Sequence, residues 1–177
     1  SFIREADRTL ICGDCVLKRI TPNPILAPDP VSPGRRFHSL AEYLVSLARL
    51  RSLSPTLAYG GHGEAVTDFE EIFHRYVRAI DERQKKVISL VKGEGATAYE
   101  VAQKLFPQSL GHDVHRFLAI SEAIAHLDYA ESEGKVAVEL SGDRYSVQTT
   151  VCDCGSGVAS EAAGDLQPLP GVEVDRD

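Results

Sequence analysis

The sequence predicts an α+β fold, and three observations indicate it. Strand-like residues open the chain at positions 2–3 and 9–12. Four stretches with helical periodicity follow between positions 39 and 133, and two alternating apolar runs at 136–140 and 145–151 then predict a hairpin. The 177 residues are 43% hydrophobic and 25% charged, which is typical of a globular protein and excludes a chain that is disordered throughout.

The first 63 residues predict two short strands, a helix and a third strand. Polar residues at 5–8 form the turn of an opening hairpin, whose second strand ends at Gly13-Asp14. Residues 18–37 contain five prolines and predict a long irregular loop, of the kind that often carries function. After the first helix, residues 56–59 predict a short strand that leads into the turn Gly60-Gly61-His62-Gly63.

Three of the four predicted helices share a start signal, the capping box. It occurs as a hydroxyl residue followed three positions later by glutamate, at 39–42, 67–70 and 97–100. The first helix ends before Pro55, the second runs from Phe69 to Val91 with or without a break, and the third ends at Pro107. The fourth is expected at 113–133, with these side chains facing inward: Val114, Phe117, Leu118, Ile124 and Leu127.

The order of elements predicts three regions: residues 1–80, a winged-helix-like domain at 81–151, and an acidic flexible tail at 152–177. Winged helices commonly read DNA through their third helix. Here that helix carries five carboxylates against Arg116, and phosphate would repel it. We therefore favour a structural or protein-contacting role for the region over DNA reading.

Charge and cysteine content narrow the classes of function. The net charge is −7, which argues against sequence-independent nucleic-acid binding, and no apolar run is long enough to span a membrane. The four cysteines form the pairs Cys12/Cys15 and Cys152/Cys154, which do not resemble a secreted disulfide framework, so we expect a cytoplasmic protein. A four-thiolate zinc site is one interpretation. We favour two coincidental pairs, because C-x-C is a poor half of a structural zinc site.

Two short motifs carry the chemistry. Asp14 follows the end of a buried strand, and His62 lies in a glycine-rich turn after another strand. Strand ends are where sites tend to be assembled on layered folds, and a carboxylate and a neutral imidazole are good ligands for Zn²⁺. Taken singly, a glycine-aspartate pair or a histidine between glycines is more often a turn than a metal site.

The combination of these motifs resembles the second half of a metallo-β-lactamase-fold hydrolase. The similarity covers about residues 1–140, through the runs 20–24, 43–47 and 61–63, and extends to 97–107, which resemble the winged-helix domain of one branch that includes endoribonucleases. The resemblance implies the second half of an αββα sandwich followed by a small winged-helix domain. It also implies a site for one or two zinc ions, with Asp14 as the bridging carboxylate and His62 as a ligand of the second metal.

One departure from the family is decisive for activity. The family's first metal motif, H-x-H-x-D-H, and a further ligand histidine are absent from this sequence. The chain contains no Met and starts with strand-like residues, so we expect it to be a fragment whose partner is the missing N-terminal half of the same fold. A degenerate homologue of the family is the alternative. By itself the chain is predicted to be inactive, to bind metal weakly, and to expose a sheet face that favours homo-oligomers.

The predicted function is a metal-dependent hydrolase that attacks an ester, thioester, lactone or phosphodiester, with a small molecule or an RNA as substrate. No catalytic residue beyond the metal ligands is predicted, and Thr21 and Asn23 are candidate substrate contacts. For RNA, basic residues at 18–19 and 35–36 would contact phosphates, although a solvated basic loop is favoured. The alternatives are a non-enzymatic winged-helix interaction protein on a lactamase-derived scaffold and, less favoured, a thiol site in the run Cys12-Gly13-Asp14-Cys15. The remaining histidines are interpreted as ordinary surface, loop or helix residues: His38, His74, His112, His115 and His126.

Overall fold

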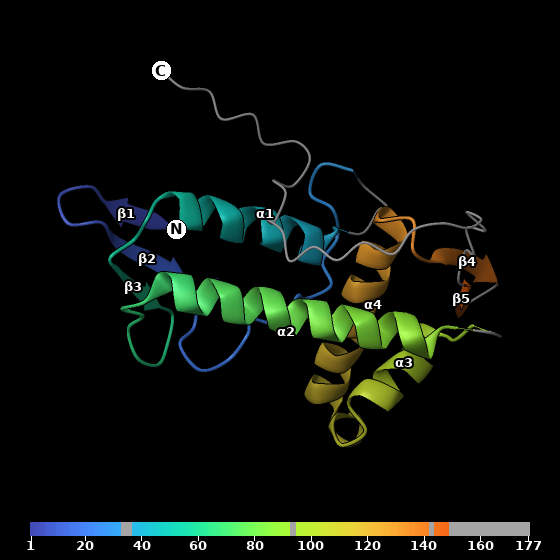
Figure 1. Ribbon diagram of the computed structural model, residues 1–177. Coiled ribbons are helices and arrows are strands. Elements are labelled where there is room, and N and C mark those ends of the chain that lie inside the picture. The colour runs from blue at the N-terminus through green and yellow to red at the C-terminus, as the bar shows by residue number, and fades with distance from the viewer. Residues whose placement is uncertain (33–36, 93–94, 142–143, 149–177) are drawn as a thin grey trace, which may run out of the picture.

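The computed structural model of the protein describes residues 1–32, 37–92, 95–141 and 144–148. Several expectations lie outside these residues: the basic residues at 35–36, the end of the last strand at 149–151, the acidic tail at 152–177, and the pair Cys152/Cys154. The described part combines short strands with helices, as the sequence predicts (Figure 1). No described helix combines the length and apolarity that crossing a membrane requires.

A small sheet opens the fold, in the order β1-β2-β3. Strands β1 (Phe2–Arg4) and β2 (Thr9–Gly13) form the predicted antiparallel hairpin, with Phe2 opposite Ile11. Strand β3 (Leu57–Gly60) then pairs with β2 in parallel, and Ile11 lies opposite Tyr59. Successive side chains of a strand point to opposite faces, so Leu10 and Ala58 are buried while Phe2, Ile11 and Tyr59 form an exposed row on the other face.

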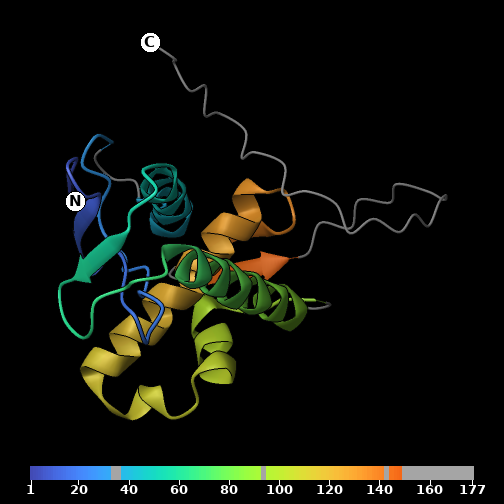
Figure 2. The same cartoon turned by 60° about the vertical axis from the view of Figure 1, so that its left-hand side comes forward.

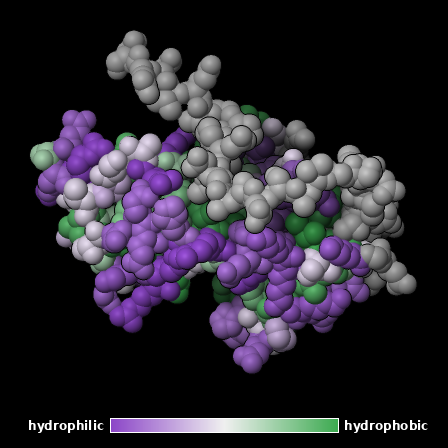
Figure 3. All heavy atoms as spheres, viewed as in Figure 1, coloured by the Kyte–Doolittle hydropathy of each residue, from purple (hydrophilic) through white to green (hydrophobic). Residues whose placement is uncertain are grey.

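Helices α1 (Ser39–Ser52) and α2 (Phe69–Leu90) cover one face of the sheet, and no described helix covers the opposite face (Figure 2). The core between them joins strand, loop and helix residues: Leu10, Cys12, Val16, Leu47, Leu50, Ala58, Val66, Phe69, Ile72, Phe73 and Tyr76. The outer side of α2 is hydrophilic, as Figure 3 shows along the middle of the molecule. The apolar period of the sequence therefore identifies the buried side of this helix correctly.

A second core lies at the far end of α2. There, α3 (Ala98–Leu105) and α4 (Asp113–Ser132) pack with the end of α2 and with Val136, and a short 3₁₀ turn, η1 (Ser109–Gly111), links the two helices. Strands β4 (Ala137–Ser141) and β5 (Arg144–Gln148) form the predicted closing hairpin. The predicted order of elements is present, while its interpretation as a winged helix stays a prediction.

Helix α2 runs without a break for 22 residues and contributes to both cores. Phe69 to Tyr76 pack against the sheet, and Val87 packs against α3 and α4. The predicted boundary between residues 80 and 81 therefore lies inside a continuous helix. The same helix holds the sheet and the second core together.

Two of the three predicted capping boxes are wrong. At α1 the cap is His38, whose side chain makes no capping hydrogen bond. At α2 the cap is Asp68, whose carboxylate accepts a hydrogen bond from the backbone N–H of Glu71 at 2.9 Å, so the helix starts one residue later than the Thr67 box implies. Only the box at Thr97 and Glu100 is confirmed, with both reciprocal hydrogen bonds formed.

The inward face predicted for the start of α4 is also wrong. Val114 and Phe117 are 59% and 51% exposed, whereas Leu127 is buried in the second core. The residues that α4 contributes to the second core, Ala123, Leu127 and Ala130, lie further along the helix. Periodicity identifies the apolar side of a helix, but it does not say where along the helix that side acquires a partner.

Candidate functional site

The two predicted metal ligands lie next to each other at one edge of the sheet. Strands β2 and β3 are parallel, with Gly13 paired to Gly60, so the segments that leave their carboxyl ends start side by side. Asp14 follows β2 and His62 follows β3 after one further glycine. The Asp14 Oδ1 and His62 Nε2 atoms are 4.0 Å apart, and both side chains are mostly exposed.

The His62 turn is closed at its base by backbone hydrogen bonds. The N–H of Ala58 donates to the carbonyl of Val66, and the N–H of Val66 donates back to Ala58, both at 2.8 Å. Gly63 has a φ of +81°, which glycine adopts readily and other residues avoid. The residues between Ala58 and Val66 thus form a tight loop that presents the imidazole of His62 toward Asp14.

Two glycines before His62 leave no room for a side chain. A Cβ atom on Gly61 would lie 2.3 Å from the Asp14 Oδ1 atom. A Cβ atom on Gly60 would lie 2.7 Å from the Val16 carbonyl oxygen and 2.9 Å from the side chain of Leu17. Glycine at position 60 therefore lets the two ligand-bearing loops pack together, and glycine at position 61 leaves space for the Asp14 carboxylate.

Two tyrosines hold the loop that follows Asp14. The hydroxyl of the fully buried Tyr76 accepts a hydrogen bond from the Leu17 N–H at 2.7 Å and lies within hydrogen-bond reach of the carbonyls of Leu17 and Ile20. The hydroxyl of Tyr43 donates to the Cys15 carbonyl at 3.0 Å. Burial raises the pKa of both phenols, so they remain protonated donors. The backbone beside Asp14 is thereby tied to α1 and α2.

A carboxylate and an imidazole at this separation fit two ligands of a divalent metal ion. An open catalytic zinc site uses three protein ligands and a water molecule. Among the described residues, no group of three or more His, Cys, Asp or Glu side chains is placed to hold a metal ion. Asp14 and His62 thus provide two possible ligands, fewer than the three protein ligands of an open catalytic zinc site.

The nearby cysteines behave as packing residues. Cys12 is buried in the first core, with its Sγ atom 3.3 Å from the Tyr59 carbonyl oxygen and 3.7 Å from that of Val16. Burial is the main cause that raises the pKa of both the Cys12 and the Cys15 thiols. A raised pKa disfavours the thiolate that nucleophilic or redox chemistry requires, which agrees with the interpretation of this pair as structural.

The basic residues next to the site are partly neutralised. The Lys18 Nζ atom lies 2.9 Å from Glu64 Oε2, and Arg19 forms an ion pair with the other oxygen of the same carboxylate. These hydrogen bonds hold the pKa of Glu64 below its usual range. Glu64 comes from the His62 loop, so the pairs join the two loops at the sheet edge.

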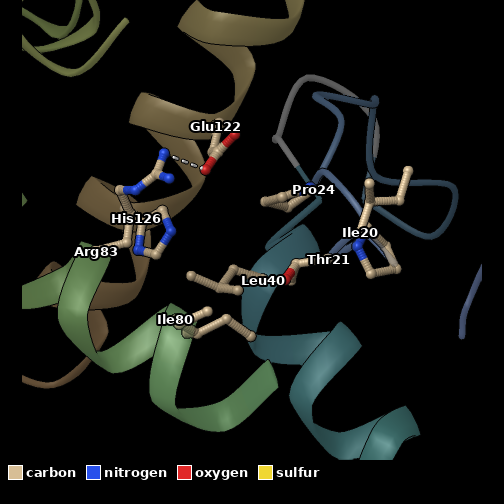
Figure 4. Close-up of a pocket in the computed structure, with 10 residues that line it drawn as sticks. Ile20, Thr21, Pro24, Leu40, Ile80, Arg83, Glu122 and His126 are labelled. Atoms are coloured by element: carbon tan, nitrogen blue, oxygen red, sulfur yellow. Dashed lines mark hydrogen bonds and ion pairs between the residues drawn. The ribbon is translucent and has the colours of Figure 1, made fainter. Parts of the chain in front are cut away.

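The two predicted substrate contacts lie in the proline-rich loop, away from the strand ends. Thr21 lines a cavity between this loop and the helices (Figure 4). The Asn23 amide donates to the Leu118 carbonyl at 3.4 Å and to Glu122 Oε2 at 3.2 Å. Asn23 therefore attaches the loop to α4, and the structure gives it a positioning role. Its substrate-binding role stays a prediction.

Sequence reasoning missed His126. It was interpreted as an ordinary helix residue, whereas its side chain is buried and lines the same cavity. Its spacing offered one signal: Glu122 lies four positions earlier and also lines the cavity, and residues four apart share one side of a helix. His112 and His115 are exposed at the start of α4, as predicted, and His38 and His74 are exposed as well.

Comparison with known proteins shows which proteins this chain is similar to. Residues 85–147 match the family model of the metallo-beta-lactamase-like C-terminal domain. A probable metallo-hydrolase of Bacillus subtilis (strain 168), YqjP, is 30% identical over 148 residues, which cover 84% of this chain and 46% of that protein. A beta-lactamase-like protein 2 homolog of Caenorhabditis elegans is 26% identical over 106 residues, 59% of this chain and 32% of that protein.

Two solved structures share the fold. A metallo-beta-lactamase family protein from Thermus thermophilus superposes with a TM-score of 0.67 and 28% identity, over 84% of this chain and 44% of that one. A beta-lactamase domain protein from Burkholderia ambifaria gives a TM-score of 0.70 and 26% identity, over 84% and 43%. The chain thus spans less than half the length of the curated relatives and solved structures described here.

Proposed function

This chain is a relative of the metallo-β-lactamase-like hydrolases and matches the C-terminal part of that superfamily, and on this premise we propose that Asp14 and His62 are two ligands of a catalytic metal centre. The observation that carries the proposal is the parallel pairing of β2 and β3. This pairing places a carboxylate and an imidazole 4.0 Å apart, although they are 48 positions apart in the sequence. The similarity to hydrolases does not favour the alternative of a non-enzymatic interaction protein.

The two residues are suited to hold one or two zinc ions or similar divalent ions. When bound, such an ion lowers the pKa of a coordinated water molecule toward neutrality and so supplies a nucleophile for hydrolysis. The chain's own contribution is positioning. Gly60 and Gly61 let the two loops approach, and Tyr43 and Tyr76 fix the backbone that follows Asp14. Substrates of the proposed class are esters, thioesters, lactones or phosphodiesters, including RNA.

The remaining ligands are proposed to come from the half of the fold that the relatives contain and this chain does not match. The exposed row of Phe2, Ile11 and Tyr59 supports this, because it is an apolar sheet face without a described cover. Two ligands leave a divalent ion exposed to water and weakly held. We therefore expect the 177-residue chain alone to be inactive.

The test uses the protein expressed from its complete reading frame. Metal content is measured by elemental mass spectrometry, and hydrolysis is measured on a panel with one ester, one thioester, one lactone and one phosphodiester. Asp14→Asn and His62→Gln are each expected to lower both metal content and hydrolysis by at least tenfold. Asp81→Asn and His74→Gln serve as matched controls, because both residues are exposed on α2.

Two results would overturn the assignment. One is full metal content and full activity in the Asp14→Asn variant. The other is an equal loss in the control variants, because that loss would trace to the fold and not to the pair. Thermal unfolding of every variant separates a lost ligand from a lost structure.

A further inference from the structure

A cavity of about 280 Å³ lies where the proline-rich loop, α1, α2 and α4 meet (Figure 4). Neither Asp14 nor His62 lines it. Its apolar walls come from Ile20, Pro22, Pro24, Leu40, Ala79 and Ile80, and its polar groups from Thr21, Arg83, Glu122 and His126. Mostly apolar walls with a few convergent polar groups are the usual composition of small-molecule sites, and the volume is near the lower end of their range.

The geometry around His126 fixes which ring nitrogen is available. The Gln84 Nε2 atom donates to the His126 carbonyl oxygen at 3.1 Å, so the Gln84 Oε1 atom must be the one that faces the ring. That oxygen lies 2.7 Å from His126 Nδ1 and can only accept, so Nδ1 carries the proton. The Nε2 atom is therefore a hydrogen-bond acceptor, and the described residues provide no donor for it.

The charged groups of the cavity are already paired. Arg83 Nη1 donates to Glu122 Oε1 at 2.6 Å, and the other oxygen of this carboxylate accepts from Asn23. The Arg83 guanidinium also stacks over the Phe106 ring at 4.7 Å. A free anion or cation entering the cavity would have to compete with a formed ion pair. The cavity is therefore suited to an uncharged occupant.

Figure 4 places His126 and Thr21 on opposite sides of the cavity, with Leu40 and Ile80 between them. An occupant that reaches the imidazole must therefore lie against aliphatic side chains. His126 is 2% exposed, and burial lowers its pKa to about 4, so the ring remains a neutral acceptor at neutral pH.

We propose that this cavity binds a small uncharged molecule with a compact apolar body and a hydroxyl group, and that the hydroxyl donates its hydrogen bond to His126 Nε2. The apolar body packs against Leu40, Ile80 and the two prolines. Asn23 keeps the proline-rich wall in place through its bonds to α4. The site is independent of the proposed metal centre.

The proposal is tested with phenol as the probe and toluene as its counterpart without a hydroxyl, on the protein expressed from its complete reading frame. Saturable binding of phenol is expected in ligand-detected titrations, with toluene at least about tenfold weaker because it cannot form the hydrogen bond. In ¹⁵N spectra of the histidine side chains, phenol is expected to shift the Nε2 resonance of His126, and toluene is not. Benzoate and benzylamine should bind more weakly than phenol because they carry charge.

Matched variants localise the binding. His126→Phe should weaken phenol binding at least tenfold, whereas His115→Phe, an exposed histidine on the same helix, should leave it unchanged. Asp14→Asn should also leave it unchanged, so that failure of the metal assignment and failure of this site are distinguishable. If His126→Phe does not fold, the ¹⁵N shift in the unsubstituted protein decides.

Three outcomes would overturn the proposal. They are equal binding of phenol and toluene, phenol binding that survives in a folded His126→Phe variant, and no saturable binding at all. The last result would mean that the cavity holds water only.

Discussion

Gly60 and Gly61 are neighbours in the chain, but the atoms that they face differ in freedom. A side chain at Gly61 would meet the end of the exposed Asp14 side chain, which can rotate away. A side chain at Gly60 would meet a backbone carbonyl and the buried Leu17, which cannot. Gly61 thus leaves space for the side chain of a candidate ligand, whereas Gly60 leaves space for the packed backbone and side chain of the fold.

This contrast predicts opposite effects of two alanine substitutions. Gly61→Ala should leave the free energy of unfolding nearly unchanged and lower metal affinity about tenfold, because the carboxylate is displaced. Gly60→Ala should cost about 1–3 kcal/mol of stability through overpacking. Chemical denaturation and a metal titration of both variants check the pair. The same stability loss in both would contradict the assigned contacts.

The burial of His126 predicts a loss of stability in acid. Its folded pKa of about 4 lies below that of an unfolded histidine, so the unfolded state takes up a proton first as the pH falls. Stability should therefore be full above about pH 6.5 and should fall by about 1 kcal/mol per pH unit between pH 6 and 4.5. Urea denaturation at several pH values measures this slope.

Two groups near His126 also influence how stability changes with pH. After burial, the second cause that lowers the pKa of His126 is the nearby Arg83 guanidinium. Burial raises the pKa of Glu122, which acts in the opposite sense near its own pKa and reduces the net loss there. His126→Phe should flatten the slope between pH 6 and 5, while His115→Phe should keep it. A slope that is unchanged without His126 would refute this explanation.

At the level of single residues, the sequence identified candidate site residues that lie directly after the end of a strand. The motifs around Asp14 and His62 were weak singly, and their joint resemblance to a known family implied a shared metal site; the parallel pairing of their strands places the two residues side by side. Tyr76 and His126 are different. Their partners, Leu17 and Gln84, are 59 and 42 positions away, and no local pattern identifies such a contact.

At the level of elements, helix type and length were more predictable than helix ends. The period of apolar residues identified all the described α-helices, because a buried side needs residues three and four apart. The caps differed from helix to helix: His38 makes no capping hydrogen bond at α1, and the Thr97 box makes two at α3. At α2, Asp68 and Thr67 both offer an oxygen, and the helix begins after Asp68, whose carboxylate accepts from Glu71. Adjacent cap candidates of similar strength cannot be ranked from sequence alone.

The sequence left open whether α2 is continuous, and the structure shows one unbroken helix. The segment from 69 to 90 lacks glycine and proline, so nothing local requires a break, yet its two ends serve different cores. The order of elements had placed a domain boundary between residues 80 and 81. The helix instead extends from one core to the other, because each half of its apolar side is covered by a different set of elements.

At the level of the whole molecule, one face of the sheet is covered by no helix among the described residues (Figure 2). Phe2, Ile11 and Tyr59 are 79%, 58% and 49% exposed and lie in one row across the three strands. Contiguous apolar surface of this kind marks an interaction site or an aggregation hazard. The covered face, with Leu10 and Ala58 fully packed, shows what a partnered side of this sheet looks like.

We predict that the 177-residue chain alone self-associates through this face. Sedimentation velocity should show oligomers of the unsubstituted chain. The double variant Phe2→Ser, Ile11→Thr should shift toward monomer, because its sheet face exposes less apolar area. Threonine keeps the strand-forming tendency of position 11. Val114→Ser on α4 is the control, since Val114 is equally exposed but distant in the chain. A monomer in the unsubstituted chain would contradict the prediction.

The parallel pairing of β2 and β3 has a kinetic consequence. The strands are joined by a crossover that contains the proline-rich loop and all of α1, so the ends of a segment of more than 40 residues must close before they pair. Non-local parallel pairing forms slowly compared with a hairpin or a helix, because the closure entropy is lost before the contacts form. The opening hairpin and α2 can form early, whereas Asp14 and His62 meet only after the crossover has docked. The candidate metal pair is therefore a late product of folding, and a metal ion cannot use both ligands to start it.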